Sequence, residues 1–476
     1  MGALVSFKVE HGTWQTTSPR VEVHAMVDEF LDAVDGDLDR LAGECPRLRD
    51  LAASIGAHRG TLTGAMVEAL VRQRHADLLT QDVAPCPDCG RCVRREKELR
   101  ARTVETMVGS TRLERPYFYC RRCRVGFAPL DKALGLSPGR KQDDLREEAA
   151  RLAMEMPYED AQGFMERLTD AGMSDCAIHE AVEQIGGPLD VLDVAPSRHE
   201  IEDRIAQLQA GHGWRPIAVL ALDGAMVPTR PDSARGSRPG RRRQRAHRAR
   251  WKGEYREAKG FRLFLVDEER IVHLISWHQV GDEKQLGQAL KRLKDEGRIP
   301  EDQVRLCVIG DGASWIWKWA EELFPSARQV LDFYHLSQYL HEVAQTQYAD
   351  DPSRACEWLE ASMARLNCNE AAGVLWGLQR MQPVSDEATK AIHAAVTYLT
   401  EHLSRLDYGS HRKGGYPIGS GAIESAHRFV AHARLKRSGA WWYEESSNHM
   451  LALRCAKYNG TLDTVFAKHA EPSHHE

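Results

Sequence analysis

Three carboxylates stand where the predicted strands and helices of an α/β region end or begin. Asp223 and Asp311 each follow an apolar, strand-like stretch, and Glu424 lies in the first turns of a helix that follows a Gly-rich break. In a twisted sheet the ends of adjacent strands converge, and a helix packed across that edge can bring a third carboxylate to the same point. Converging carboxylates repel one another, and hard divalent cations such as Mg²⁺ or Mn²⁺ relieve the repulsion. The spacing therefore predicts a metal centre.

A centre of this kind suits phosphoryl transfer. Two ions ~3.5–4 Å apart can activate a water or a 3′-hydroxyl and stabilise the leaving oxygen. The alternative for each residue is structural, because an Asp-Gly pair after a strand commonly forms a turn and a Glu near a helix N-terminus is favourable there. Two such Asp-Gly pairs and a Glu in one topological order favour the metal centre.

The elements that must position these residues alternate between strand and helix patterns. Apolar runs predict strands at 217–222, 261–266, 271–277, 305–309 and 328–332 and helices at 284–296 and 315–323. The stretch 336–406 is helical throughout, and a Gly-rich break at 416–421 precedes a long basic helix. The predicted order is β-β-β-α-β-α-β, with a helical insertion before the last helix.

The cysteines give a second, separate signal. Two C-x₂-C pairs are formed by Cys86, Cys89, Cys120 and Cys123. Alternating residues at 103–108 and 112–119 predict a hairpin between the pairs, around Gly109-Ser110. Four thiolates at this spacing suit structural Zn²⁺, since they leave no open position for catalysis. Cys92 forms a further C-x₂-C pair with Cys89, so one ligand stays open, and free thiols without metal are the alternative.

The N-terminal part is predicted to be helical. Apolar residues at helical spacing run from Val21 to Leu79, interrupted at Pro46 and at 56–60. Helical patterning returns at 158–185, where a Gly-containing turn at 171–173 separates two short stripes and Ser174 can cap the second helix. This pattern fits a helix-turn-helix, although any helical hairpin would give it.

Charge is segregated along the chain. The net charge is −5, from 64 Lys and Arg against 69 Asp and Glu, yet residues 235–252 carry nine basic side chains and no acidic one. Such a tract can neutralise DNA phosphates and displace counterions, or it can be a solvated loop. The residues expected to contact DNA are Arg241, Arg242, Arg243, Arg245, Arg428, Arg434, Lys436 and Arg437.

Length and composition set the broad class. The 476 residues suggest about three domains, and 42% apolar with 28% charged residues is ordinary for a soluble globular protein. We find neither a long apolar run nor a signal-peptide pattern at the N-terminus, so we expect a cytoplasmic protein with no membrane partner.

Three blocks of the sequence resemble a known family. The blocks VLALDGAMV, LCVIGDGASWIWKWAEELFPSARQVLDFYH and PIGSGAIESAHRFVAHARLKRSGAWW are similar to the catalytic blocks of ISKra-type bacterial insertion-sequence transposases, within the Mutator-like group of DDE transposases. The resemblance runs from about Pro85 to Tyr458, and the third block is its most specific part.

The resemblance implies roles for particular residues. Asp223, Asp311 and Glu424 would form the catalytic triad on a ribonuclease-H-like core and hold two Mg²⁺ or Mn²⁺ ions. Asp332 and His335 match the C/D-x-x-H motif of Mutator-like relatives, which makes them site-proximal with their roles left open.

The resemblance also implies an activity. A DDE transposase binds the ends of its own insertion sequence, cleaves DNA strands and transfers 3′-hydroxyl ends to target DNA. Its partner would be double-stranded DNA, on which it would form a homo-oligomer in the bacterial cytoplasm, associated with the nucleoid. Two alternatives remain: a transposase-derived DNA-binding protein without catalysis, and a ribonuclease-H-like nuclease.

The expected fold is therefore multidomain. A helical and zinc-ribbon-like N-terminal region with a helix-turn-helix precedes an α/β ribonuclease-H-like core that carries an all-helical insertion. The expected parts are a helical region at 1–80, a four-cysteine zinc-ribbon-like module at 81–135, a helix-turn-helix-like DNA-binding region at 140–200, a catalytic core at 214–335 and 416–460, a helical insertion at 336–415 and a tail at 461–476.

Overall fold

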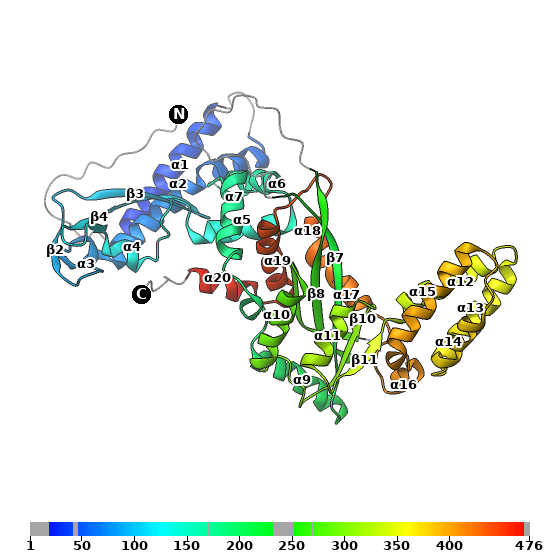
Figure 1. Cartoon of the computed structure of the whole chain (residues 1–476). Helices are drawn as coiled ribbons and strands as arrows, with labels where there is room; N and C mark the ends of the chain where they lie inside the picture. Colours follow the sequence, from blue (N-terminus) through cyan, green and yellow to red (C-terminus); the bar gives the residue numbers. More distant parts are fainter. Residues whose placement is uncertain (1–18, 41–45, 170, 232–251, 269, 471–476) are drawn as a thin grey trace. The chain divides into compact units, whose positions relative to one another are not determined.

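The structure, a computed structural model, describes residues 19–40, 46–169, 171–231, 252–268 and 270–470 (Figure 1). The chain divides into two compact units, one of residues 1–181 with 470–476 and one of residues 182–469. Helices and strands are mixed within each unit. Among the described residues, no helix is both long and apolar enough to cross a membrane.

The first unit combines helices with three small hairpins. Its elements are α1 (Pro19–Arg40), α2 (Leu48–Arg74), α3 (Ala76–Leu79), β1 (Val83–Pro85), β2 (Cys92–Arg94), β3 (Arg100–Thr106), β4 (Gly109–Arg115), β5 (Phe118–Cys120), β6 (Val125–Phe127), α4 (Pro129–Ala133), α5 (Asp143–Glu155), α6 (Tyr158–Leu168) and most of α7 (Asp175–Gly186). Strands β1 and β2, β3 and β4, and β5 and β6 pair antiparallel.

Helix α2 runs through the segment 56–60, where we predicted an interruption. Its glycines serve close packing instead, because the β3–β4 hairpin lies directly against the helix backbone. A Cβ on Gly64 would lie 2.3 Å from the carbonyl oxygen of Ser110, and a Cβ on Gly109 would lie 2.4 Å from that of Gly60. Small residues therefore give α2 a flat face for the hairpin, and this tertiary contact offsets the low helix propensity of glycine.

The predicted helical pair at 158–185 is present as α6 and α7. The Ser174 hydroxyl accepts a hydrogen bond from the Ala177 backbone N–H at 3.2 Å, as expected of a cap. Tyr158 of α6 meets His179 of α7 edge to face, with ring centroids 5.3 Å apart. The two helices are thus in contact, as in a helix-turn-helix or any other helical hairpin.

The second unit is built on one mixed sheet of five strands. These are β7 (Ile217–Thr229), β8 (Glu254–Asp267), β9 (Arg270–Val280), β10 (Arg305–Gly310) and β11 (Arg328–Leu331). Their order across the sheet is β11-β10-β7-β8-β9. Strands β7, β8 and β9 form an antiparallel meander, whereas β10 pairs parallel with β7 and β11 parallel with β10. The predicted succession of strands and helices is confirmed.

Strand β7 is longer than predicted and does not end at Asp223. It continues to Thr229, because residues 224–229 pair with residues 254–259 of β8 in an extended hairpin. Asp223 therefore lies within a strand, opposite Gly260. We misread Asp223-Gly224 as a strand end because the same dipeptide is common in turns.

The second unit also contains a series of helices. They are α8 (Val191–Val194), α9 (Arg198–His212), α10 (Glu283–Asp295), α11 (Ser314–Leu323), α12 (Phe333–Gln347), α13 (Pro352–Asn367), α14 (Ala371–Arg380), α15 (Asp386–His402), η2 (Leu403–Arg405), α16 (Tyr408–Lys413), α17 (Gly421–Ala426), the π-helix η3 (His427–His432), α18 (Ala433–Leu435), α19 (Glu444–Asn459) and α20 (Leu462–Ala470). The helical insertion is α12 to α16, with side-chain caps at Asp351 and Ser385 separating its longer helices.

The basic segment after the Gly-rich break is not the single long helix that we predicted. Helix α17 passes into the π-helix η3 and ends with α18, and a turn with Gly439 at φ 76° separates it from α19. Arg428 and Arg434 therefore lie on this helix, whereas Lys436 and Arg437 lie in the turn after it.

Helix α19 covers the edge strand β9 through two asparagines. Asn459 accepts a hydrogen bond from the Ser276 N–H at 2.7 Å and donates to the Ser276 carbonyl at 3.0 Å. Asn448 makes the same pair of bonds with Val280, at 2.7 and 2.9 Å. Each side-chain amide thus replaces a neighbouring strand, which satisfies the edge and blocks pairing with another chain.

We expect Asn459→Ala to lower the free energy of unfolding by about 2–4 kcal/mol, because it leaves buried backbone groups of Ser276 without partners. Denaturant unfolding of the full chain measures this. Asn448→Ala, at a half-buried position, should cost less and serves as the comparison. Unchanged stability in Asn459→Ala would contradict the edge-clamp interpretation.

Candidate acidic centre and cysteine cluster

Strands β7 and β10 bring Asp223 and Asp311 side by side. The strands pair in parallel with Leu222 opposite Gly310, so the two aspartates occupy the next positions along neighbouring strands. The Asp311 carboxylate accepts a hydrogen bond from the Ala313 N–H at 2.9 Å, which shapes the turn into α11. Burial raises the pKa of Asp311, and the charge of Asp223 raises it further. The register thus makes Asp223 and Asp311 neighbours on adjacent strands.

A fourth carboxylate, which sequence reasoning missed, lies close by. Glu257 is on β8, and its charge also raises the pKa of Asp311. Its carboxylate lies over Gly224, where a Cβ would be 1.8 Å from Glu257 Oε1. Lys259 is buried and forms an ion pair with Glu257. No local pattern marks Glu257, because only the register of β7 and β8 brings it here.

Glu424 lies on a helix that packs over the same strands. Helix α17 contacts β7 and β8, and Arg262 of β8 donates to the Ala422 carbonyl at 2.8 Å. One turn after Glu424, His427 reaches Asp223, with Nε2 3.2 Å from Oδ2. Glu424 itself is exposed. Among the described residues, only the four cysteines discussed below gather three or more potential ligand atoms within 4.8 Å, so Glu424 lies on a helix beside β7 and β8 without sharing a closed ligand set with the aspartates.

Asp332 holds the helix that carries Glu424. It is 1% exposed; one carboxylate oxygen accepts the His335 N–H at 2.9 Å, which caps α12, and the other accepts the Ser420 N–H. The Phe333 N–H also donates to the Ile418 carbonyl at 2.8 Å. Asp332 thus fixes the segment leading into α17. His335 is half-buried, and its charge lowers the pKa of Asp311, opposing the larger effect of burial.

The expected DNA-contacting residues have different positions. Arg241, Arg242, Arg243 and Arg245 lie outside the described residues, in the segment joining β7 to β8. Arg428, Lys436 and Arg437 are exposed, whereas Arg434 is not. Arg434 is 3% exposed and its guanidinium stacks on the buried Trp442 ring, 4.8 Å from the centroid. The expectation of a phosphate contact is therefore wrong for Arg434, which packs in the core.

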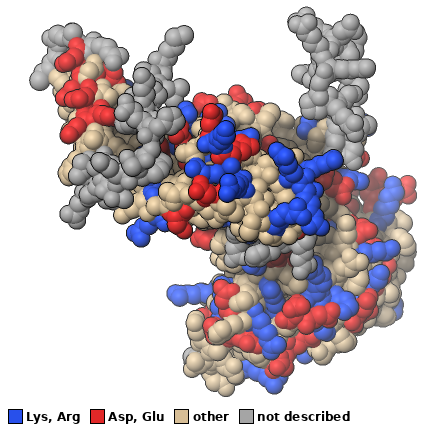
Figure 2. Space-filling view, turned by 90° about the vertical axis from the view of Figure 1, so that its left-hand side faces the viewer, with Lys and Arg blue, Asp and Glu red and all other residues tan. Residues whose placement is uncertain are grey.

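Surface charge is mixed rather than uniformly positive. On the face drawn in Figure 2, Lys and Arg side chains are interspersed with Asp and Glu. Helix α7 does not present a basic surface either. Its exposed side chains include Asp175 and Glu180, and the helix contains no Lys or Arg. A role for α7 in contacting phosphates finds no support in this charge distribution.

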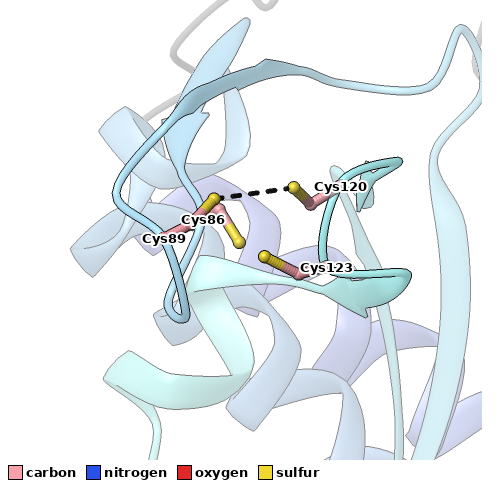
Figure 3. Close-up of side chains that lie close together, drawn as sticks. All are labelled: Cys86, Cys89, Cys120 and Cys123. Atoms are coloured by element: carbon pink, nitrogen blue, oxygen red, sulfur yellow. Dashed lines mark hydrogen bonds between the residues drawn. The ribbon is translucent and has the colours of Figure 1, made fainter.

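The four predicted cysteines come together in the first unit (Figure 3). The sulfur atoms of Cys86, Cys89, Cys120 and Cys123 all lie within 4.8 Å of one another, and Cys89 and Cys120 Sγ are 3.9 Å apart. A tetrahedron with metal–sulfur bonds of ~2.3 Å has edges of ~3.8 Å, so the arrangement fits Zn²⁺. Cys92 is exposed and lies outside the cluster, so the four clustered cysteines are Cys86, Cys89, Cys120 and Cys123.

Two tight hairpins shape this cluster. The first pair of cysteines lies in the β1–β2 turn and the second in the β5–β6 turn. In each, the residue after the second cysteine is left-handed: Gly90 at φ 68° and Arg124 at φ 58°. The Gly90 N–H donates to the Cys86 carbonyl at 2.9 Å, and the Arg124 N–H to the Cys120 carbonyl at 2.8 Å. The two turns therefore present their thiols in the same way.

The cluster also favours thiolate at Cys120. The Cys123 backbone N–H donates to its sulfur and lowers the pKa of Cys120 to about 7. The thiolate is the form that ligates a metal. Cys86 and Cys120 are each 2% exposed, which protects them from solvent.

A hollow elsewhere in the second unit is not this acidic centre. Its volume is about 670 Å³, and Arg305, Arg328, Arg405 and Tyr416 contribute to its lining. Arg305 begins β10 and Arg328 begins β11, whereas Asp311 follows the other end of β10. The lining of this hollow does not include Asp223, Asp311 or Glu424.

Comparisons with known proteins are sparse. A model of an uncharacterised protein family, UPF0236, matches residues 240–468, just under half of the chain. The matched range includes Asp311 and Glu424 and begins after Asp223. No curated protein matches the chain. Among solved structures, a crystal structure of a pre-cleavage Mos1 transpososome matches with 12% identity over 57% of this chain and 80% of that chain, at a TM-score of 0.14. This TM-score is too low to show a shared fold.

We expect the purified chain to contain one zinc ion bound by the cysteine cluster. Cys86→Ser and Cys120→Ser should lose it and unfold the module, since zinc binding supplies the folding free energy of such small sites. Elemental analysis of the purified protein measures this. Cys92→Ser is the matched control and should keep its zinc; zinc loss in that variant, or full zinc content in Cys86→Ser, would refute the assignment.

Proposed function

We propose that this chain is a DNA transposase of the DDE kind, which binds the ends of its own insertion sequence, cleaves DNA strands and joins the 3′-hydroxyl ends to target DNA. The observation that carries the proposal is the placement of Asp223 and Asp311 on neighbouring parallel strands. The sheet order β11-β10-β7-β8-β9, with three antiparallel strands and then two parallel ones, supports a ribonuclease-H-like core. The three sequence blocks favour the ISKra-type, Mutator-like group.

The carboxylates of the acidic centre fit a divalent cation. The donors are carboxylate oxygens, which Mg²⁺ and Mn²⁺ prefer, and the raised pKa of Asp311 reflects burial together with the surplus negative charge of Asp223 and Glu257. Asp223 and Asp311 would hold the metal, with Glu424 as the third ligand. The chemistry supplied by two bound ions is activation of a water or 3′-hydroxyl and stabilisation of the leaving oxygen.

The chain's own residues would prepare this centre. Asp332 fixes the start of α17 and so limits where Glu424 can lie. The basic tract 235–252 follows from the end of the β7–β8 hairpin and would neutralise DNA phosphates, which makes binding strongly dependent on salt. Exposed Arg428, Lys436 and Arg437 would add to this surface. Helix α7 would not contribute to the DNA contacts, because its exposed charged side chains are acidic.

The remaining assignments complete the proposal. The four-cysteine module would hold structural zinc and keep the N-terminal region folded, while α12 to α16 form the helical insertion of the catalytic core. We keep the domain bounds given by the sequence as part of the proposal; the structure itself divides the chain between residues 181 and 182. Because a transposase must hold two DNA ends, we propose that it acts as a homo-oligomer on DNA.

We expect the full chain, given Mg²⁺ and a duplex carrying the DNA that flanks its coding region, to cut at the element end and join strands. Asp223→Asn and Asp311→Asn should bind the duplex but lower cleavage by ~10³-fold or more, since metal catalysis contributes several kcal/mol and each ~1.4 kcal/mol is tenfold. Strand cleavage and joining are read on sequencing gels.

Asp295→Asn, a substitution of an exposed aspartate on α10, is the matched control and should cut normally. Binding without cleavage by the wild type would instead indicate a non-catalytic DNA-binding protein. Cleavage without joining would indicate a nuclease, and either outcome would overturn the transposase proposal.

A further inference from the structure

Three positions form a row across the sheet beside the proposed metal ligands. Asp223 of β7 pairs with Gly260 of β8, and Gly260 pairs with His278 of β9. Residues paired in this way face the same side of a sheet. A Cβ on Gly260 would lie 2.4 Å from His278 Cδ2, so the imidazole occupies the space that any other residue at 260 would fill. The glycine therefore leaves room for a histidine ring between β9 and Asp223.

His427 bridges the two ends of this row. Its Nδ1 lies 3.0 Å from His278 Nε2, and its Nε2 lies 3.2 Å from Asp223 Oδ2. The two rings are nearly perpendicular, at 81°, with centroids 4.9 Å apart. His427 is 4% exposed and His278 is fully buried. The result is a continuous line of polar atoms from the core of the sheet to the Asp223 carboxylate.

The line has a preferred arrangement of protons. Burial lowers the pKa of His278 well below its ordinary value, so that ring is neutral. If His278 Nε2–H donates to His427 Nδ1, the His427 proton lies on Nε2, facing Asp223. The opposite tautomer would place a nitrogen lone pair against the carboxylate, which is repulsive. His427 Nε2 lies 3.2 Å from Asp223 Oδ2 without meeting hydrogen-bond geometry, and it has no other hydrogen-bond partner among the described residues.

The backbone is built to deliver this ring. His427 begins the π-helix η3, a wider turn that loosens the regular helical hydrogen bonding. Arg454 of α19 is 7% exposed and donates to the carbonyls of Val430, at 2.7 Å, and Phe429. A buried guanidinium thus satisfies carbonyls within the π-turn. Such turns inside helices are frequent at functional sites.

We propose that His427 is a positioning residue for Asp223, holding its carboxylate through an Nε2–H donor while His278 fixes the tautomer. This inference rests on the proposed function, because it takes Asp223 as a metal ligand. Hydrogen bonds to ligating carboxylates set their orientation, and loss of such a partner commonly costs ~10–100-fold in metal affinity. His427 therefore tunes cation binding without touching the cation.

The test is Mn²⁺ binding by the zinc-loaded full chain without DNA, followed by electron paramagnetic resonance of free Mn²⁺. His427→Leu fills the space but offers no donor, and it should weaken binding ~10–100-fold. His427→Gln places an amide N–H where the imidazole Nε2–H lies, and it should bind within a few-fold of the wild type. His393→Gln, at an exposed position of α15, is the control and should match the wild type.

The outcomes separate this inference from the proposed function. Wild-type affinity in His427→Leu, or equal weakening in His427→Leu and His427→Gln, would overturn the positioning role. If His427→Leu does not fold, as judged by circular dichroism, the folded His427→Gln decides: near-wild-type binding supports the role and weak binding overturns it. Wild-type Mn²⁺ binding that Asp223→Asn leaves unchanged would instead remove the proposed metal centre itself.

Discussion

The placement of Asp223 beside the partly buried Asp311 is the constraint on which the proposed centre depends. Pairing of β7 with β10 places the two carboxylates on adjacent strands, and both are partly buried, which strengthens their interaction relative to water. Because the folded state raises the pKa of Asp311, the ionised carboxylate costs stability, and the cost grows as pH rises above the ordinary range of an aspartate. Removing one of the two charges should therefore raise the free energy of unfolding.

The surroundings of Asp311 and Asp223 offset part of this cost and connect distant segments to it. The Ala313 N–H donates to Asp311, and the Tyr398 hydroxyl of α15 donates to the Asp311 backbone carbonyl at 3.3 Å. A Cβ on Gly312 would lie 2.3 Å from the Tyr398 ring, so the helical insertion packs directly on the turn after β10. His427 faces Asp223 from η3. The helical insertion thus contacts Asp311 and the turn after it, and the C-terminal helices contact Asp223.

Sequence alone predicted the parts that leave a local pattern. Apolar runs predicted the strands before Asp223 and Asp311, and paired C-x₂-C spacing predicted the four cysteines that cluster. The exclusion of Cys92 required the hairpins, since its spacing to Cys89 satisfies the same pattern. Glu257, His278 and His427 could not be predicted, because strand register and a π-turn bring them to Asp223 from distant segments. For the same reason, Asp223-Gly224 was misread: only the partner strand reveals that its glycine makes room for a carboxylate.

Thermal unfolding of Asp311→Asn beside the wild type, with and without Mg²⁺, tests the central claim most directly. Asparagine keeps the acceptor for the Ala313 N–H and removes the charge. Without Mg²⁺ the variant should melt a few degrees higher, since ~1 kcal/mol shifts Tm by about 2–4 °C in a unit of this size, and Mg²⁺ should raise the Tm of the wild type alone. A lower Tm for the variant without Mg²⁺, together with equal stabilisation of both proteins by Mg²⁺, would contradict the account.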